Sequence, residues 1–132
     1  MRRYFYLALP LMALALASCT KYEGPGGSSS IVGKIHHMVY DGANNLINEY
    51  DAPKHDVYII YGNNAADTYF DDDIETSFDG TFRFDNLEKG NYRIFTYEKC
   101  PTCPSGDSTL FFDVEITEKR QEIDLGTISV RD

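Results

Sequence analysis

The chain has 132 residues, of which 42% are hydrophobic and 14% are aromatic, and its formal net charge is −9 at pH 7. These proportions exclude an intrinsically disordered chain, which lacks the apolar side chains needed to form a core. The length predicts one domain, which can bury a core without a metal ion or a cofactor. The acidic charge argues against a nucleic-acid partner, because phosphate groups bind basic surfaces.

The N-terminus has the three parts of a secretory signal peptide. Arg2 and Arg3 form a basic start, residues 4–17 are mostly apolar, and the sequence Leu-Ala-Ser-Cys ends at Cys19. This ending resembles the lipobox that bacterial lipoprotein signal peptidase cleaves before a cysteine. The resemblance implies that residues 1–18 are removed and that the Cys19 thiol carries a diacylglycerol. Acyl chains at this position would hold the protein on a membrane.

The sequence argues against two other interpretations of the N-terminal segment, a transmembrane anchor and a twin-arginine signal. A transmembrane anchor needs roughly 20 apolar residues, whereas this apolar run is shorter and contains Pro10. The Arg2-Arg3 pair suits a twin-arginine signal, but nothing downstream predicts a cofactor domain that must fold before export. We therefore expect export by the ordinary secretory route.

Residues 20–30 are almost free of apolar side chains and collect Gly, Pro and Ser, which predicts a flexible tether. Thr20 follows the cysteine in place of the Asp that resembles an inner-membrane retention signal, and this favours the outer membrane or the cell surface. The predicted organisation is a signal peptide (1–18), a lipidated Cys19 with its tether (19–30) and one domain (31–132).

After the tether, apolar residues recur with a period of two rather than 3.6, which predicts strands and no helix longer than one turn. Phe112, Val114 and Ile116 alternate with acidic residues, so they should face the core. The last strand changes parity at Gly126, where a β-bulge would restore the inward face. We expect an all-β, antiparallel sandwich of about seven strands. The expected segments are 31–40, 45–50, 56–61, 67–77, 81–86, 91–98 followed by 109–117, and 121–130.

Residues 76–94 carry a recognisable pattern. It consists of a tight Asp-Gly turn that needs positive φ, two phenylalanines that alternate inward, a second turn at glycine, and two more inward side chains. These residues are Asp79, Gly80, Phe82, Phe84, Gly90, Tyr92 and Ile94.

This pattern, together with the opening sequence Ile-Val-Gly-Lys-Ile at residues 31–35, resembles the carboxypeptidase regulatory-like domain over roughly residues 31–98. The resemblance implies a transthyretin-like (prealbumin-like) β-sandwich that supplies no catalytic residues. The connection from the first strand to Val57 is longer than is usual in that family, so the pairing of residues 36–56 is left open. With the lipobox and the tether, the whole chain looks like a small lipoprotein of Bacteroidota type.

Once lipid takes the thiol of Cys19, two cysteines remain in an oxidising compartment. These are Cys100 and Cys103, and we expect them to form a structural disulfide. Because the loop between them is so short, the bond should stabilise the fold by about 2 kcal/mol or less.

Two further interpretations of Cys100 and Cys103 stay open. A redox dithiol needs a thiol near a helix N-terminus, and the flanking prolines and neighbouring strands argue against one. A zinc site needs four ligands, so His36, His37 or His55 would have to approach the two cysteines. His36 and His37 are neighbours on a strand and should point to opposite faces, one toward the core and one toward solvent.

An acidic run consists of Asp71, Asp72 and Asp73, with Glu75 close behind. It resembles the oxygen-rich sets that bind Ca²⁺, but it lacks the spacing and the glycine of an EF-hand loop. We expect a solvated loop or a charged edge strand, since edge charges discourage pairing between sheets. The sequence does not decide whether these residues bind a cation.

The sequence contains no nucleophile elbow, phosphate loop or paired-carboxylate motif. It also ends Ser-Val-Arg-Asp, without the Tyr-Arg-Gly-Ser motif of the related transthyretin-like hydrolases. We therefore expect no enzymatic activity. From Cys19 onward the chain has ten basic and 21 acidic residues, a net charge of −11, which repels nucleic acid and anionic lipid headgroups.

The sequence therefore predicts a lipid-anchored binding or accessory module at the outer membrane or cell surface, with a protein or a glycan as its partner. Two other hypotheses stay open. One is a small thiol-disulfide or metal-handling envelope protein that uses Cys100 and Cys103. The other is a subunit of an envelope assembly whose exposed aromatic residues, such as Tyr58 or Tyr97, make the contacts.

Overall fold

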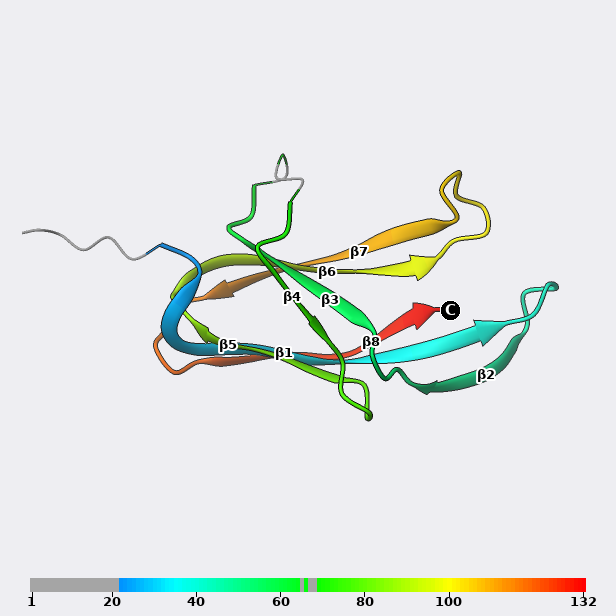
Figure 1. The fold of residues 1–132 in the computed structure, drawn as a ribbon, viewed down its shortest axis with the longest axis horizontal. Coiled ribbons are helices and arrows are strands. Elements are labelled where there is room, and N and C mark those ends of the chain that lie inside the picture. Colours follow the sequence, from blue (N-terminus) through cyan, green and yellow to red (C-terminus); the bar gives the residue numbers. More distant parts are fainter. Residues whose placement is uncertain (1–21, 65, 67–68) are drawn as a thin grey trace, which may run out of the picture.

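The computed structural model describes residues 22–64, 66 and 69–132. They form eight strands in two packed sheets (Figure 1). None of these described residues forms a helix that could cross a membrane. The predicted signal peptide and Cys19 lie outside the described residues. The strands are β1 (Pro25–Tyr40), β2 (Leu46–Asp51), β3 (Asp56–Tyr61), β4 (Asp72–Glu75), β5 (Thr81–Leu87), β6 (Gly90–Lys99), β7 (Asp107–Ile116) and β8 (Glu122–Arg131).

The first sheet, which we call the β1 sheet, is built around β1. The first half of β1 pairs with β5, its second half pairs with β2, and β8 lies along its opposite edge. The second sheet, which we call the β6 sheet, has the order β4-β3-β6-β7. This arrangement confirms the predicted β-sandwich.

The pair β1–β8 differs from the prediction because it is parallel, whereas every other strand pair is antiparallel. The physical reason is visible in Figure 1, where β7 ends at the same end of the sandwich at which β1 begins. A short turn from β7 therefore starts β8 in the same direction as β1. This long-range return brings the two ends of the described chain into one sheet.

The core lies between the inward faces of the two sheets, as the period-two pattern predicts. Phe82 and Phe84 from the β1 sheet and Tyr92 and Ile94 from the β6 sheet belong to one buried cluster. On β7, Val114 and Ile116 are buried, and Phe112 packs against the same cluster. The remaining buried members are Ile31, Ile35, Ala52, Val57, Ile59, Leu87, Ile128 and Val130.

Two glycines take the backbone conformations that the sequence predicts. Gly80 has a φ of 80° in the turn before β5, where a Cβ atom would lie 2.5 Å from the Ile35 carbonyl oxygen. Gly126 has a φ of 71° at a shift in the β1–β8 register, where Val32 lies opposite Asp124 but Lys34 lies opposite Thr127. The extra residue on β8 is the expected bulge, and it turns Ile128 and Val130 into the core.

The first strand begins six residues earlier than the sequence predicts, because β1 includes residues 25–30 of the expected tether. Ser29 is only 1% exposed. Its hydroxyl donates a hydrogen bond to the Glu118 carbonyl (2.9 Å) and accepts one from the Gln121 amide (3.1 Å). A serine-rich composition predicts solvent exposure, but here the small hydroxyls satisfy the backbone of the β7–β8 turn.

The sequence did not predict how residues 36–56 pair. In the structure they form the β1–β2 hairpin and the connection from β2 to β3. β2 pairs with β1 from His36 opposite Asp51 to Tyr40 opposite Leu46. The first two residues of the expected strand 67–77 lie outside the described residues, and of the rest only the four residues of β4 form a strand. The expected segments 91–98 and 109–117 are separate strands, β6 and β7, so the structure has eight strands instead of about seven.

A pair of neighbouring substitutions tests this register. Phe84→Ala should lower the free energy of unfolding by about 3–5 kcal/mol, because it removes a buried ring and leaves a cavity. Arg83→Ala should cost far less, because Arg83 points outward and its ion pairs with Asp85 and Glu122 are solvent-exposed. Urea unfolding followed by fluorescence measures both values. Equal losses for the two variants would contradict the register of β5.

Candidate functional site

The outer face of the β6 sheet carries three aromatic side chains side by side, which we call the aromatic row. They are Tyr58 on β3, Phe95 on β6 and Phe111 on β7. The strand register places Tyr58 opposite Phe95 and Phe95 opposite Phe111. The ring centroids of Tyr58 and Phe95 lie 4.9 Å apart, and those of Phe95 and Phe111 lie 5.6 Å apart. The row therefore crosses three hydrogen-bonded strands, which hold the rings in fixed positions.

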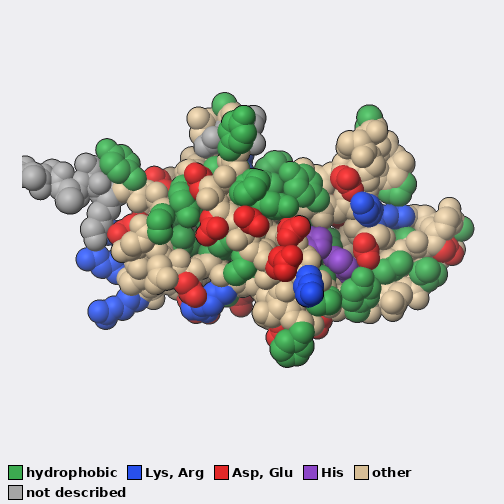
Figure 2. Space-filling view, in the orientation of Figure 1, with side chains coloured by type: hydrophobic (Ala, Val, Ile, Leu, Met, Phe, Trp, Pro, Cys, Tyr) green, Lys and Arg blue, Asp and Glu red, His purple; other side chains and the backbone are tan. Residues whose placement is uncertain are grey.

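Two further rings extend the aromatic row. Phe70, in the loop before β4, lies 4.8 Å from Tyr58, and Tyr97 lies 5.7 Å from Tyr58 and 5.8 Å from Phe95, centroid to centroid. Phe95 is only 7% exposed, but Phe70, Tyr97 and Phe111 are 49%, 48% and 56% exposed. Figure 2 shows hydrophobic side chains gathered on this side of the molecule, with acidic side chains beside them. The neighbours thus cover the central ring and leave the outer rings open to solvent.

Polar groups border the aromatic row. Asp73 on the edge strand β4 lies opposite Tyr58 in the register. The Arg93 guanidinium lies 5.4 Å from the centre of the Phe111 ring and donates two hydrogen bonds to Asp113, of 2.7 and 3.1 Å. Burial raises the pKa of the Tyr58 phenol, and nearby acidic groups raise it further. The phenol therefore stays protonated at neutral pH and can donate a hydrogen bond.

The aromatic row follows from strands that are apolar on both faces. On β6, Tyr92 and Ile94 point into the core, so the alternation of a strand turns Phe95 and Tyr97 outward. Tyr58 and Tyr97 are the exposed aromatic contacts that the sequence predicts. Phe70, Phe95 and Phe111 were not predicted. The available signal was consecutive aromatic residues within one strand, such as Phe111-Phe112, because one of the two must face away from the core.

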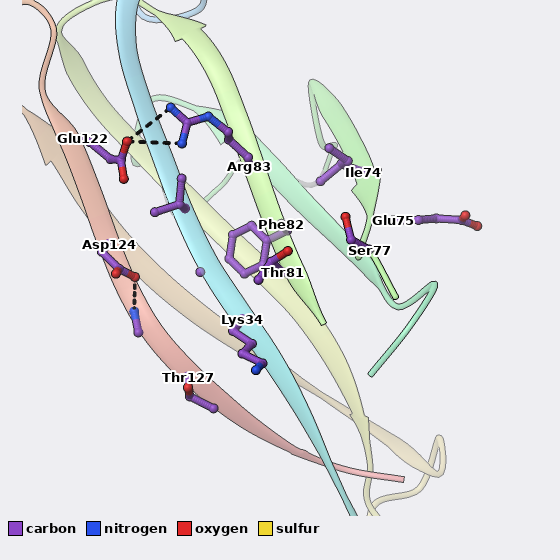
Figure 3. A pocket seen from close by; sticks show the side chains of 13 residues that line it. Lys34, Ile74, Glu75, Ser77, Thr81, Phe82, Arg83, Glu122, Asp124 and Thr127 are labelled. Carbon is purple, nitrogen blue, oxygen red and sulfur yellow. Dashed lines mark hydrogen bonds and ion pairs between the residues drawn. The ribbon is translucent and has the colours of Figure 1, made fainter. Parts of the chain in front are cut away.

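A hollow of about 610 Å³ lies on the opposite side of the sandwich, over the β1 sheet (Figure 3). Both cationic side chains that line it already have partners. Arg83 pairs with Glu122 at 3.2 Å, and Lys34 pairs with Asp51 at 2.7 Å. The one ring that lines it, Phe82, is buried in the core. The described residues that line this hollow therefore present neither an unpaired cation nor an exposed ring to a ligand, in contrast to the aromatic row.

The two adjacent histidines point to opposite faces of β1. His36 lies on the outer face, where its Nδ1 atom is 3.0 Å from Asp51. His37 points between the sheets, where its Nε2 atom lies 2.8 Å from Nδ1 of His55, and Nε2 of His55 lies 2.6 Å from the Thr96 hydroxyl. His37 and His55 therefore form a polar bridge from β1 to β6.

Cys100 and Cys103 form the expected disulfide in the turn between β6 and β7, with their Cα atoms 5.3 Å apart. The zinc hypothesis finds no support in the part of the chain that the structure describes, since no three His, Cys, Asp or Glu side chains there are grouped to hold a metal ion. Asp72 and Asp73 are exposed on β4, which lies at the edge of the β6 sheet, as a charged edge strand predicts.

The polar bridge predicts a pH dependence of stability. Burial is the largest cause that lowers the pKa of both His37 and His55. Below about pH 6.5, the usual histidine value, the unfolded chain therefore binds more protons than the folded chain. The stability contributed by the neutral pair is fully present above that pH and is lost as the pH falls through the lowered pKa values. Urea unfolding measured from pH 7.5 to 5 should show this decline.

A substitution in the polar bridge separates this effect from other titrations. His55→Gln should flatten the decline between pH 7.5 and 5, because it removes one of the two partly buried imidazoles. His36→Gln, on the opposite face of the same strand, leaves the contact of His37 with His55 intact and should retain most of the decline, because the charge of His36 is the smallest of the causes that set the pKa of His37. The same slope in the wild type and His55→Gln would contradict the account.

No family model matches the sequence, and no curated protein matches it. Two solved structures have a backbone path similar to that of this chain. A Pseudomonas aeruginosa protein described as a candidate carbohydrate-binding protein is 12% identical, with a TM-score of 0.49, over 83% of this chain and 92% of its own. (S)-Allantoin synthase is 14% identical, with a TM-score of 0.39, over 77% of this chain and 42% of its own. Neither likeness carries an argument about function, and the resemblance to the carboxypeptidase regulatory-like domain stays a prediction.

Proposed function

We propose that this protein is a lipid-anchored, non-enzymatic module of the outer membrane or cell surface that binds a glycan on its aromatic row. The observation that carries the proposal is the exposure of Phe70, Tyr97 and Phe111 around a covered central ring. Exposed aromatic groups of this kind on a soluble surface are characteristic of interaction sites. The rings cost little to order on binding, because paired strands already hold Tyr97 and Phe111.

A glycan matches both the aromatic rings of this surface and the polar groups beside them. The ring of a sugar has apolar C–H faces, which pack on aromatic rings, and hydroxyl groups at its edge, which need hydrogen-bond partners. Tyr58, Tyr97 and Asp73 place phenol and carboxylate groups next to the aromatic faces. Three adjacent strands span about 10 Å at their usual spacing, so the row offers room for more than one sugar ring.

The charge of the chain narrows the class of glycan. The chain from Cys19 onward has a net charge of −11, and Asp56, Asp73 and Asp113 are close to the aromatic row in the register. Carboxylates and sulfates on a glycan would be repelled by these groups. We therefore propose a neutral or amino-containing glycan as the ligand.

The location and the accessory role rest on the sequence. Cys19 at the end of the lipobox would carry the acyl chains, and Thr20 favours the outer membrane over the inner one. The resemblance of residues 31–98 to the carboxypeptidase regulatory-like domain supports an accessory domain without catalytic residues. The exposed rings would then present the glycan to a partner or hold the protein on a polysaccharide layer.

Alanine substitutions in the aromatic row test the binding face. Tyr97→Ala and Phe111→Ala should each weaken binding to neutral or amino-containing polysaccharides by at least about fivefold, because an exposed ring that stacks on the ligand is worth more than about 1 kcal/mol. Affinity gel electrophoresis and isothermal titration calorimetry on a panel of polysaccharides measure the loss.

Phe78→Ala is the matched control, because Phe78 is 89% exposed in the turn before β5, away from the aromatic row. It should bind as the wild type does. If no polysaccharide binds, or if all three variants bind equally, the glycan proposal is wrong. If Tyr97→Ala and Phe111→Ala instead abolish binding to a protease-sensitive component of the cell envelope, the face binds a protein.

The anchor has its own test. Cys19→Ser should abolish fatty-acid labelling and release the protein from the membrane fraction, because a hydroxyl group cannot form the thioether. Cys100→Ser in the disulfide is the control and should keep the label. A Cys19→Ser variant that still incorporates fatty acid and stays in the membrane would show that the lipoprotein assignment is wrong.

A further inference from the structure

The polar bridge is the middle of a longer path of hydrogen-bonding groups, which we call the hydrogen-bond chain. At one end, the Tyr50 hydroxyl lies 2.9 Å from the Asp132 carboxylate and 3.1 Å from Nδ1 of His37. Nε2 of His37 lies 2.8 Å from Nδ1 of His55. At the other end, Nε2 of His55 lies 2.6 Å from the Thr96 hydroxyl, which donates a 2.8 Å hydrogen bond to the Asp56 carbonyl. Five links therefore join six groups from both sheets.

The hydrogen-bond chain is one proton short when both histidines are neutral. Its two ends, the Asp132 carboxylate and the Asp56 carbonyl, can only accept hydrogen bonds. The four groups between them are two hydroxyls and two imidazoles, and each has a single hydrogen to donate. Four hydrogens cannot fill five links, so one link holds no hydrogen.

The distances and charges identify the empty link. Two lone pairs that face each other repel, so the links of 2.6 and 2.8 Å around His55 must each hold a hydrogen. Asp132 is charged and therefore competes best for the hydrogen of Tyr50. The empty link is the longest one, the 3.1 Å contact between the Tyr50 hydroxyl and Nδ1 of His37. It follows that His37 and His55 both carry their hydrogen on Nε2.

We propose that Nδ1 of His37 is a proton-binding site, at which the folded protein takes up one proton in mildly acidic solution as the first step of a pH-sensitive switch. The added proton fills the empty link, because the imidazolium donates to the Tyr50 oxygen while Tyr50 continues to donate to Asp132. All five links are then occupied. The new positive charge lies 3.5 Å from the Asp132 carboxylate, which is its counter-ion.

A second proton finds no acceptor in the hydrogen-bond chain. A proton on Nδ1 of His55 would face the N–H group of His37, so two donors would meet at 2.8 Å. Burial is the largest cause that lowers the pKa of both histidines. The next cause is Asp132 for His37, whose pKa it raises, and the charge of His37 for His55, whose pKa it lowers. His37 therefore titrates first, and the polar bridge opens only when His55 follows.

Other titratable groups face the switch from the neighbouring strands. His36 lowers the pKa of His37, and the Asp56 carboxylate raises that of His55. A hollow of about 190 Å³ opens beside the two histidines, and its charged side chains are Glu98, Lys99, Asp107, Arg131 and Asp132.

The charged groups of this hollow other than Asp132 have partners elsewhere. Lys99 pairs with Asp107 at 3.1 Å, and the Arg131 guanidinium donates a 2.8 Å hydrogen bond to Asn44. Glu98 accepts hydrogen bonds from the Ser108 hydroxyl and the Arg131 amide. Tyr97 also lines the hollow, so the charge of the switch develops next to the aromatic row.

Nitrogen NMR of the isotope-labelled full chain tests the proposal directly, because imidazole nitrogen shifts report which ring nitrogen carries a proton. At pH 7.5, His37 and His55 should both be protonated on Nε2 alone. As the pH falls toward 5, Nδ1 of His37 should gain its proton before Nδ1 of His55 does. A proton on Nδ1 of His37 already at pH 7.5, or protonation of His55 first, would overturn the inference. This titration of the wild type needs no variant.

A pair of carboxylate substitutions identifies the counter-ion. Asp132→Asn should lower the pKa of His37 by at least about 0.5 unit, because it removes the charge that stabilises the imidazolium. Asp73→Asn is the control, since Asp73 is an exposed carboxylate on the edge strand β4, and it should leave the pKa of His37 unchanged. An unchanged pKa of His37 in Asp132→Asn would contradict the proposed switch.

Discussion

The structure depends on β6, the strand that packs on both of its faces. Inward, Tyr92 and Ile94 fill the core against the β1 sheet. Outward, Phe95 is the central ring of the aromatic row, and Tyr97 extends the row beside it. The Tyr92 hydroxyl also accepts a hydrogen bond from the Gly24 amide and donates one to the Glu88 carbonyl, so the same strand fixes the point where the chain enters the sandwich. One strand thus links the packing of the core to the geometry of the aromatic row and to the point at which the chain enters the sandwich.

The two outer faces of the sandwich differ in what they expose. The outer face of the β6 sheet carries the aromatic row, whereas the cations over the β1 sheet, Lys34 and Arg83, are paired with carboxylates. The polar bridge of His37 and His55 lies between the sheets, where neutral imidazoles supply hydrogen bonds that an apolar pair would lack.

Local patterns predicted much of this fold. The alternation of Phe82 and Phe84, the turn at Gly80 and the bulge at Gly126 follow from side-chain parity and from backbone conformations that favour glycine. Long-range pairing was not predictable, because no local pattern says that β8 returns to run parallel to β1. The early start of β1 was not predicted, because the serines of residues 28–30 have the composition of a flexible tether. For the candidate site, Tyr58 and Tyr97 were named, but their assembly with Phe95 and Phe111 needs the register of three strands, which a single sequence does not contain.

The central claim is that a ligand covers the aromatic row when the protein is on the cell. Hydroxyl-radical footprinting on intact cells and on the purified protein measures this cover directly, because oxidation of an aromatic side chain follows its exposure. The account predicts that Tyr97 and Phe111 are protected on cells and oxidised after purification, whereas Phe78 is oxidised in both. Equal oxidation of Tyr97 and Phe111 in the two preparations would contradict the account.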